Sequence, residues 1–223
     1  MGESPLAVTT LFHIGPVPIT LPVVTTWVIV IGLALLFFLS TRRLTIVAGR
    51  WQAALEILVT TVEMQIKEVV GEDARRILPL IGTLFIFLLV SNLSGTIPGV
   101  KAPTATLATD GALALLVFTA TQYYGVKAQG ILGYLGSFIK PTPLMLPLHV
   151  VSQITRTFSL MVRLFGNIMS GELIIGVILS LAGLVLPIPL MLLEILVGLL
   201  QAYIFSILAT VFIGSAISEG ESA

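Results

Sequence analysis

Residues 159–175 read Ser159-Leu-Met-Val-Arg163-Leu-Phe-Gly-Asn167-Ile-Met-Ser-Gly-Glu172-Leu-Ile-Ile, an apolar stretch that contains one arginine and one glutamate. On insertion scales an arginine near the centre of a bilayer costs at least ~3 kcal/mol, so it indicates a functional site. The alternative is an arginine whose long side chain reaches a lipid headgroup, as happens near helix ends. Long apolar runs lie on both sides of Arg163, and they favour the functional interpretation.

The composition of the chain indicates a membrane protein. Of its 223 residues, 57% are hydrophobic and 10% are charged, whereas soluble domains carry about 25% charged residues. Such a chain cannot build a charged surface around one core, so we expect an all-α membrane protein. The formal net charge is zero, which gives no reason to expect a nucleic-acid partner. The chain has no cysteine, so disulfides and thiolate metal sites are excluded.

The N-terminal residues 1–22 are expected to form an outer arm ahead of a single membrane domain, residues 23–223. The arm lacks a basic segment and is rich in proline, so it does not resemble a cleaved signal peptide. Residues 23–40 are an apolar run of spanning length. Three arginines follow closely (Arg42, Arg43 and Arg50). The positive-inside rule then places this end in the cytoplasm and the N-terminus outside.

Residues 51–70 show the pattern of an amphipathic helix. Apolar residues recur every three or four positions on one side (Leu55, Leu58, Val59, Val62, Ile66 and Val69). Glu63 and Lys67 are spaced for an ion pair on the polar side. The segment is too polar to span, so we expect it on the cytoplasmic membrane surface or against a partner. Gly71 is expected to end it.

Further apolar runs predict four more crossings, which makes five in all and leaves the C-terminus in the cytoplasm. Residues 77–93 and 107–124 are the second and third spans. The last two helices form a hairpin over residues 144–217, interrupted at Pro187-Ile-Pro189. The first of them, residues 147–186, would be about 60 Å long, twice the hydrocarbon thickness. Either its first part lies outside the hydrocarbon or the helix is strongly tilted.

Helical phase sorts the polar residues of the hairpin onto two faces. One face of its first helix carries a polar stripe that recurs every three or four positions (Arg156, Ser159, Arg163, Asn167 and Ser170). Glu172 is half a turn out of phase with Arg163 and ~13 Å along the axis, so the two should not pair. A hairpin that brings Glu172 level with Glu194 forms a carboxylate pair near the outer turn. Gln201 would then lie deeper, near the level of Arg163 or Asn167.

Structural roles compete for several of these residues. Asn167 and Gln201 can serve as interhelical hydrogen bonds worth ~1 kcal/mol. His149 fits an interfacial or core histidine better than a proton donor. Ser159 can bond its own helix backbone, as Ser170 can. Asp110 begins the third span, and a carboxylate stabilised by a helix N-terminus is favoured there over a transport role.

Glu172 and Glu194 are harder to explain structurally, because carboxylates inside membranes are rare without a function. Such a pair suits a proton relay, and it suits a cation site for Na⁺ equally well. Arg163 cannot act as an acid or base, because its guanidinium group keeps its proton. No acidic residue lies on its helix face. We therefore expect its carboxylate partner on another chain.

The run Arg163-Leu-Phe-Gly-Asn167-Ile-Met-Ser-Gly-Glu172-Leu-Ile resembles the signature of subunit a of the F-type ATP synthase family. Two further stretches resemble its last-helix and outer-loop patterns, Leu200-Gln201-Ala-Tyr-Ile-Phe205 and Ser91-Asn92-Leu-Ser-Gly-Thr-Ile-Pro98-Gly with Pro103-Thr. The resemblance covers most of the chain from Glu63 onward. Some positions depart from the family pattern. Glu194 falls where some members carry histidine, Thr157 where proline is common, and Asp110 has no clear counterpart.

The resemblance implies the stator of a rotary motor in a bacterial inner membrane. Its partners would be membrane lipid, the b subunits of a peripheral stalk, and a ring of c subunits bearing membrane-buried carboxylates. The tilted hairpin would face that ring and supply two offset half-channels. Arg163 would keep the half-channels separate and promote ion release. Asn167 and Gln201 would lie near the arginine, with Glu172 in the outer half-channel.

On this interpretation the chain is not an enzyme by itself but part of a proton- or sodium-translocating ATP synthase. It has no phosphate-cradling glycine motif, so ATP chemistry would occur on another subunit. No cofactor or metal is expected, apart from Na⁺ at Glu172 and Glu194, since the pair fits both ions. One rival is an autonomous channel or secondary transporter, which needs its own counter-charge for Arg163. Another is a structural scaffold in which Arg163 only anchors a partner.

Overall fold

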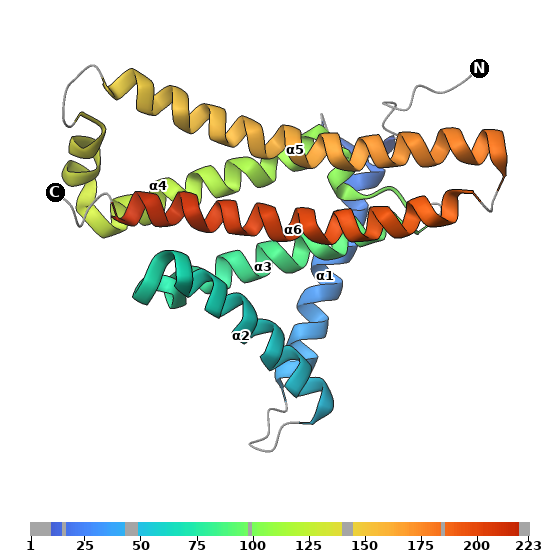
Figure 1. Ribbon diagram of the computed structural model, residues 1–223, viewed down its shortest axis with the longest axis horizontal. Helices are drawn as coiled ribbons and strands as arrows, with labels where there is room; N and C mark the ends of the chain where they lie inside the picture. The colour runs from blue at the N-terminus through green and yellow to red at the C-terminus, as the bar shows by residue number, and fades with distance from the viewer. Residues whose placement is uncertain are drawn as a thin grey trace.

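The computed structural model describes residues 10–14, 17–42, 49–97, 100–139, 145–183 and 186–218. Six α-helices make up most of these residues (Figure 1): α1 (Leu21–Thr41), α2 (Arg50–Val70), α3 (Ala74–Ser94), α4 (Leu107–Ile139), α5 (Met145–Ala182) and α6 (Pro187–Ser218). Short 3-10 helices, η1 (Gly71–Asp73) and η2 (Pro103–Ala105), precede α3 and α4. The fold is therefore helical, as the composition predicts.

A two-stranded antiparallel ribbon precedes α1, and the sequence analysis did not predict it. Strands β1 (Thr10–Ile14) and β2 (Val17–Thr20) pair Ile14 with Val17 and Phe12 with Ile19. β-branched and aromatic residues favour this extended pairing. A ribbon of two strands consists only of edges, so it tolerates the prolines of this segment. The ribbon is the exception to the expected all-α fold.

Four helices are long and apolar enough to cross a membrane: α1, α3, α5 and α6. Helix α1 exposes large apolar side chains, including Val28 and Ile31, which are 64% and 66% exposed. Pro22 lies in its first turn, where proline is tolerated because the missing N–H has no helical acceptor. These surfaces suit contact with lipid, and the chain is a multi-pass membrane protein.

Helix α4 differs from the prediction of a third span over residues 107–124. It begins at Leu107 as expected but continues to Ile139, with a break at Gly130, whose φ is 74°. The break turns the chain so that the Tyr134 ring lies against Gly125. The Tyr134 hydroxyl donates to Gln122 Oε1 at 2.6 Å. Helix α4 is not among the four helices that are apolar enough to span.

Helix α2 ends at Gly71, as predicted, because this glycine adopts a φ of 67° that other residues rarely adopt. Ile66 is buried, but Val59 and Val69, on the predicted apolar side, are each 43% exposed. The predicted Glu63–Lys67 pair is wrong. Glu63 instead lies 3.3 Å from Arg75 Nε, because η1 returns the chain beside the end of α2.

Helix α6 lies at the centre of the bundle and packs against α2, α3, α4 and α5. Its buried face alternates large residues with small ones (Gly198, Ala202, Phe205, Ala209, Ile213 and Gly214). A Cβ on Gly198 would lie 3.1 Å from the Asn92 Cβ of α3, and one on Gly214 would lie 3.1 Å from Val70 of α2. Small residues thus let neighbouring helices approach closely.

The last two helices form a long hairpin whose members lie side by side (Figure 1). Helix α5 has 38 residues and α6 has 32, so they are about 57 Å and 48 Å long. The break between them differs slightly from the prediction. It includes Gly183, with a φ of 72°, and ends before Pro187, which begins α6.

Candidate functional site

The polar stripe of α5 faces outward from the chain. The residues Arg156, Ser159, Arg163 and Ser170 are exposed, whereas Leu160, Leu164 and Ile168 on the other side are buried. Within the described residues, Arg163 has no ion pair and no hydrogen bond. Arg156, two turns earlier, lies over the Phe212 ring of α6 at 5.3 Å. Arg163 thus presents a fixed positive charge that the described part of this chain does not neutralise.

Glu172 and Glu194 come together on the other side of the hairpin. The Glu194 carboxylate lies directly against Gly171, since a Cβ there would be 2.6 Å from its Oε1. Both side chains are half-buried, and their carboxylates interact electrostatically. Lys101 and the backbone N–H of Ala102, in the segment between α3 and α4, interact with the Glu172 carboxylate. This cluster joins two helices and a loop around a concentration of negative charge.

Asn167 and Gln201 lie next along the hairpin. The Asn167 Nδ2 donates to Gln201 Oε1 at 3.5 Å, which is at the long end of hydrogen-bond distances. Gln201 is buried, and its Nε2 has no partner among the described residues. The pair therefore joins α5 and α6 at the level expected from the sequence and leaves one buried donor unused.

The two remaining predicted residues lie apart from the carboxylate pair. Ser159 is exposed on the outward stripe of α5. His149 is half-buried near the start of α5, 23 residues and about 35 Å along the helix from Glu172. The structure therefore does not bring His149 to the carboxylate pair. Ser170 donates to the Asn167 carbonyl at 3.0 Å, the local bond expected for it.

Asn92 makes a connection between elements that the sequence did not predict. Its Nδ2 donates to the Gly198 carbonyl of α6 at 2.9 Å, and Thr104 Oγ1 donates to its Oδ1 at 2.9 Å. Both side chains are buried. An amide inside an apolar helix was the available signal, because such groups bond across helices. The stretch that begins at Ser91 resembled an outer-loop pattern, but Asn92 itself lies inside α3, which extends to Ser94, close to the predicted end of the second span.

Asp110 lies in the first turn of α4, where the sequence placed it. Its side chain is fully buried, and neither carboxylate oxygen has a hydrogen-bond partner in the described structure. A helix N-terminus stabilises a carboxylate by about 0.3–1 kcal/mol, rising to ~2 kcal/mol when partly buried. Burying an ion costs several kcal/mol. The helix dipole alone therefore does not account for Asp110.

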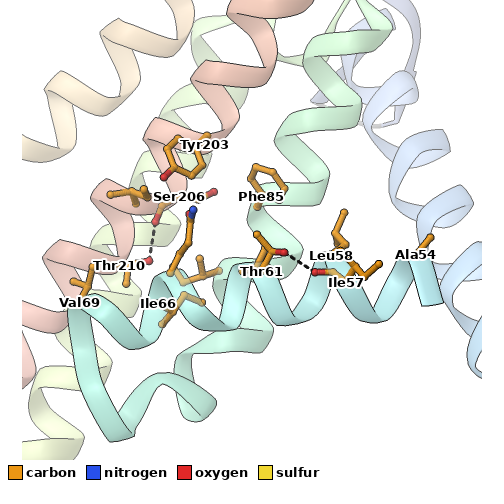
Figure 2. Close-up of a pocket in the computed structure, with 14 residues that line it drawn as sticks. Ala54, Ile57, Leu58, Thr61, Ile66, Val69, Phe85, Tyr203, Ser206 and Thr210 are labelled. Carbon is orange, nitrogen blue, oxygen red and sulfur yellow. Dashed lines mark hydrogen bonds between the residues drawn. The ribbon is translucent and has the colours of Figure 1, made fainter. Parts of the chain in front are cut away.

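Two cavities lie away from these polar groups. Figure 2 shows the first, of about 420 Å³, between α2, α3 and α6, with Phe85 and Tyr203 on its wall. The hydroxyls of Ser206 and Thr210 beside it are bonded to their own helix backbone. A larger cavity of about 700 Å³ has apolar walls from α1, α2, α3 and α4. Neither cavity contains Arg163 or the carboxylate pair, and their walls favour apolar occupants over ions.

These features define a multi-pass helical membrane protein with Arg163, Glu172 and Glu194 on one long helical hairpin. The family described as ATP synthase A chain matches residues 23–214. The chain belongs to this family.

Curated relatives match over nearly the whole chain. ATP synthase subunit a 2 of Bradyrhizobium sp. strain BTAi1 is 63% identical over 219 residues, which cover 98% of each chain. ATP synthase subunit a 1 of Hahella chejuensis is 48% identical over 93% of this chain and 88% of the relative. ATP synthase subunit a of Legionella pneumophila is 42% identical over the full length of both. The family places the chain in the membrane sector of a bacterial F-type ATP synthase, among the other subunits of that sector.

Proposed function

We propose that this chain is the ion-translocating stator of the rotary ATP synthase. It would provide two offset half-channels to the carboxylates of a c-ring. Arg163 would separate the half-channels and make each arriving carboxylate release its ion. The observation that carries this proposal is an exposed Arg163 without a partner among the described residues of its own chain. In a membrane, such a charge requires an anion from a neighbouring subunit.

The chemistry of the arginine supports this role. Its guanidinium group remains charged, so it can attract a ring carboxylate but cannot carry a proton itself. A carboxylate that approaches Arg163 is stabilised in its ionised form, and it therefore gives up its H⁺ or Na⁺. The same fixed charge repels cations, which prevents an ion from passing between the two half-channels without rotation of the ring.

The carboxylate pair supports an outer half-channel. Glu172 and Glu194 would take the ion from the outer side, close to the loop that carries Lys101. Asn167 and Gln201 would continue the route toward Arg163 along the hairpin. The pair suits transfer of a proton or transient binding of Na⁺. His149, near the other end of α5, and Ser159, one turn before Arg163, would belong to the cytoplasmic side.

The membrane arrangement that fits this role has five crossings, made by α1, α3, α4, α5 and α6. The N-terminus would lie outside and the C-terminus in the cytoplasm. Helix α2 would lie along the cytoplasmic surface, next to the charged corner where Arg76 pairs with Asp73 at 3.0 Å. The hairpin would be strongly tilted. Its length supports tilt, as does the course of α1, which crosses the direction of α5 and α6 in Figure 1.

The partners in this proposal follow from the exposed surfaces. The polar stripe of α5 would face the c-ring, the exposed apolar side chains of α1 would face lipid, and b subunits of a peripheral stalk would hold the chain in place. ATP chemistry would occur elsewhere in the complex. Each elementary charge that crosses 100 mV supplies ~2.3 kcal/mol, so several ions are needed for each ATP.

The rival function is an autonomous channel or secondary transporter. Such a protein needs a counter-charge for Arg163 on its own chain, and the described residues supply none. Gentle purification distinguishes the two. The stator should co-isolate with a small, very apolar protein that carries one membrane-buried carboxylate. If the chain purifies alone and conducts ions alone, the stator proposal fails.

A further inference from the structure

We propose that Asp110 is a third carboxylate on the outer ion path, where it binds the transported cation behind the α5–α6 hairpin. This inference rests on the proposed function and extends it. The cation is H⁺ or Na⁺, either of which a carboxylate can bind.

The surroundings of Asp110 require a partner that the described residues do not supply. Asp110, Ala114, Val117 and Thr121 recur at helical spacing and are all buried, so Asp110 projects toward the interior of the bundle. Neither of its oxygens has a hydrogen-bond partner among the residues that the structure describes. An ionised carboxylate there has no counter-charge, and a protonated one has no acceptor for its O–H. A bound cation, or a proton with its water, satisfies the site.

The position of Asp110 joins it to the other polar groups of the hairpin. The next residue, Gly111, packs on α5, where a Cβ would be 3.3 Å from Met161 Sδ. Met161 precedes Arg163 by two residues. It lies ten residues, or about 15 Å, along α5 from Gly171, where Glu194 packs. The first turn of α4 therefore packs beside the part of α5 that carries Arg163, at the inner end of the proposed outer path.

Bonding sets Asp110 apart from the structural polar residues of the same bundle. Asn92 joins two helices through its hydrogen bonds, and the Thr121 and Thr210 hydroxyls donate to their own helix backbone. The polar side-chain groups of these buried residues therefore have hydrogen-bond partners. The buried groups without a partner in the described chain are different. They are the Ser91 hydroxyl, both Asp110 oxygens and Gln201 Nε2. Unsatisfied buried groups are few in folded proteins, and a buried carboxylate whose two oxygens both lack a partner among the described residues points to an occupant.

The experiment uses the whole ATP synthase, reconstituted in liposomes with its outer side facing the lumen. A potassium diffusion potential is held constant, and initial ATP synthesis is measured as the lumenal cation is varied. One arm varies lumenal pH without sodium. The other varies lumenal Na⁺ at fixed pH with a protonophore present. The variants are Asp110→Asn, Asp110→Thr and Asp110→Glu, with Thr119→Ala on an exposed part of α4 as the matched control.

The neutral variants should need at least about tenfold more lumenal cation for half-maximal synthesis, equivalent to about 1.4 kcal/mol of binding free energy. Asp110→Glu should restore much of the affinity, and the cation requirement on the opposite side should not change. The proposal is overturned if an assembled neutral variant stays within twofold of the unmodified enzyme, or shifts both sides equally. It is also overturned if only the carboxylate variants assemble, because the group is then structural.

The proposed function fails in a different way in the same assay. If Glu172→Gln with Glu194→Gln, or Arg163→Ala, leaves synthesis unchanged, the stator mechanism is wrong whatever Asp110 does. If those variants lose synthesis while the neutral Asp110 variants keep their lumenal affinity, only the inference about Asp110 is wrong.

Discussion

Glu194 on α6 packs its carboxylate directly on Gly171 of α5, where a Cβ would come within 2.6 Å of Oε1. Only a glycine leaves room for this approach, which brings Glu194 beside Glu172. The contact involves the far end of a flexible side chain, so relieving it does not require the helices to move apart. The position of one glycine therefore determines where a titratable group of the proposed outer path lies.

Gly171→Ala should slow ion-driven ATP synthesis severalfold while leaving assembly intact. The added methyl group displaces the Glu194 carboxylate, and the backbone of both helices stays in place. The measurement is the initial rate of synthesis, normalised to the amount of complex recovered. Gly176→Ala is the matched control, because a Cβ at that position meets nothing within 4 Å. Equal rates for the two variants would show that the Glu194 position is unimportant.

Glu172→Gln combined with Glu194→Gln should slow ion uptake from the outer side more than either single change. Each carboxylate can partly replace the other when the two are neighbours, but amides cannot carry the ion. Ion flux into vesicles at a fixed membrane potential measures this directly. A double variant that transports at the unmodified rate would place the outer path elsewhere.

Asn92→Ala should destabilise the protein, because it removes two buried hydrogen bonds and leaves the buried Thr104 hydroxyl without its acceptor. Each unsatisfied buried group costs about 1–3 kcal/mol. When the purified complex is heated, the variant subunit should be lost at a lower temperature than the unmodified one. Thr83→Ala on the exposed side of α3 is the control. Unchanged thermal stability for Asn92→Ala would contradict this role.

Gly125→Ala should disrupt the C-terminal part of α4. A Cβ there would lie 2.5 Å from the Tyr134 ring, which the hydroxyl bond to Gln122 holds in place. Relief requires the segment after Gly130 to move, so this segment should become more accessible to limited proteolysis. Gly82→Ala, on α3, has open space around it and should leave the digestion pattern unchanged. Identical patterns for the two variants would show that the ring does not hold this turn.

Local signals in the sequence predicted much of this fold. The single glycine at position 71 predicted the end of α2, and the polar spacing on α5 predicted one outward-facing stripe. Contacts between distant residues were beyond such signals. Asn92 and Gly198 are 106 positions apart, and nothing local indicates that they meet. Both Lys67 and Arg75 lie close enough in the sequence to pair with Glu63. The path of η1 brings Arg75 to it instead of Lys67.

The candidate site, too, could be predicted from the sequence only in part. Counting along α5 separates Arg163 from Glu172, because helical geometry alone determines their relative positions. The isolation of Asp110 could not be predicted, because it depends on which neighbours fail to offer a bond. The continuation of α4 beyond residue 124 was also missed, since it depends on Tyr134 returning to Gly125.

Ion-driven ATP synthesis by an Arg163→Ala variant is the decisive measurement for the proposed role of this arginine. Arg156→Ala is the matched control, because Arg156 belongs to the same stripe but lies over the Phe212 ring. In reconstituted liposomes with equal amounts of assembled complex, the account predicts that Arg163→Ala abolishes synthesis, with uncoupled ion leak, while Arg156→Ala retains coupled synthesis. Coupled synthesis at the unmodified rate by Arg163→Ala would contradict the account.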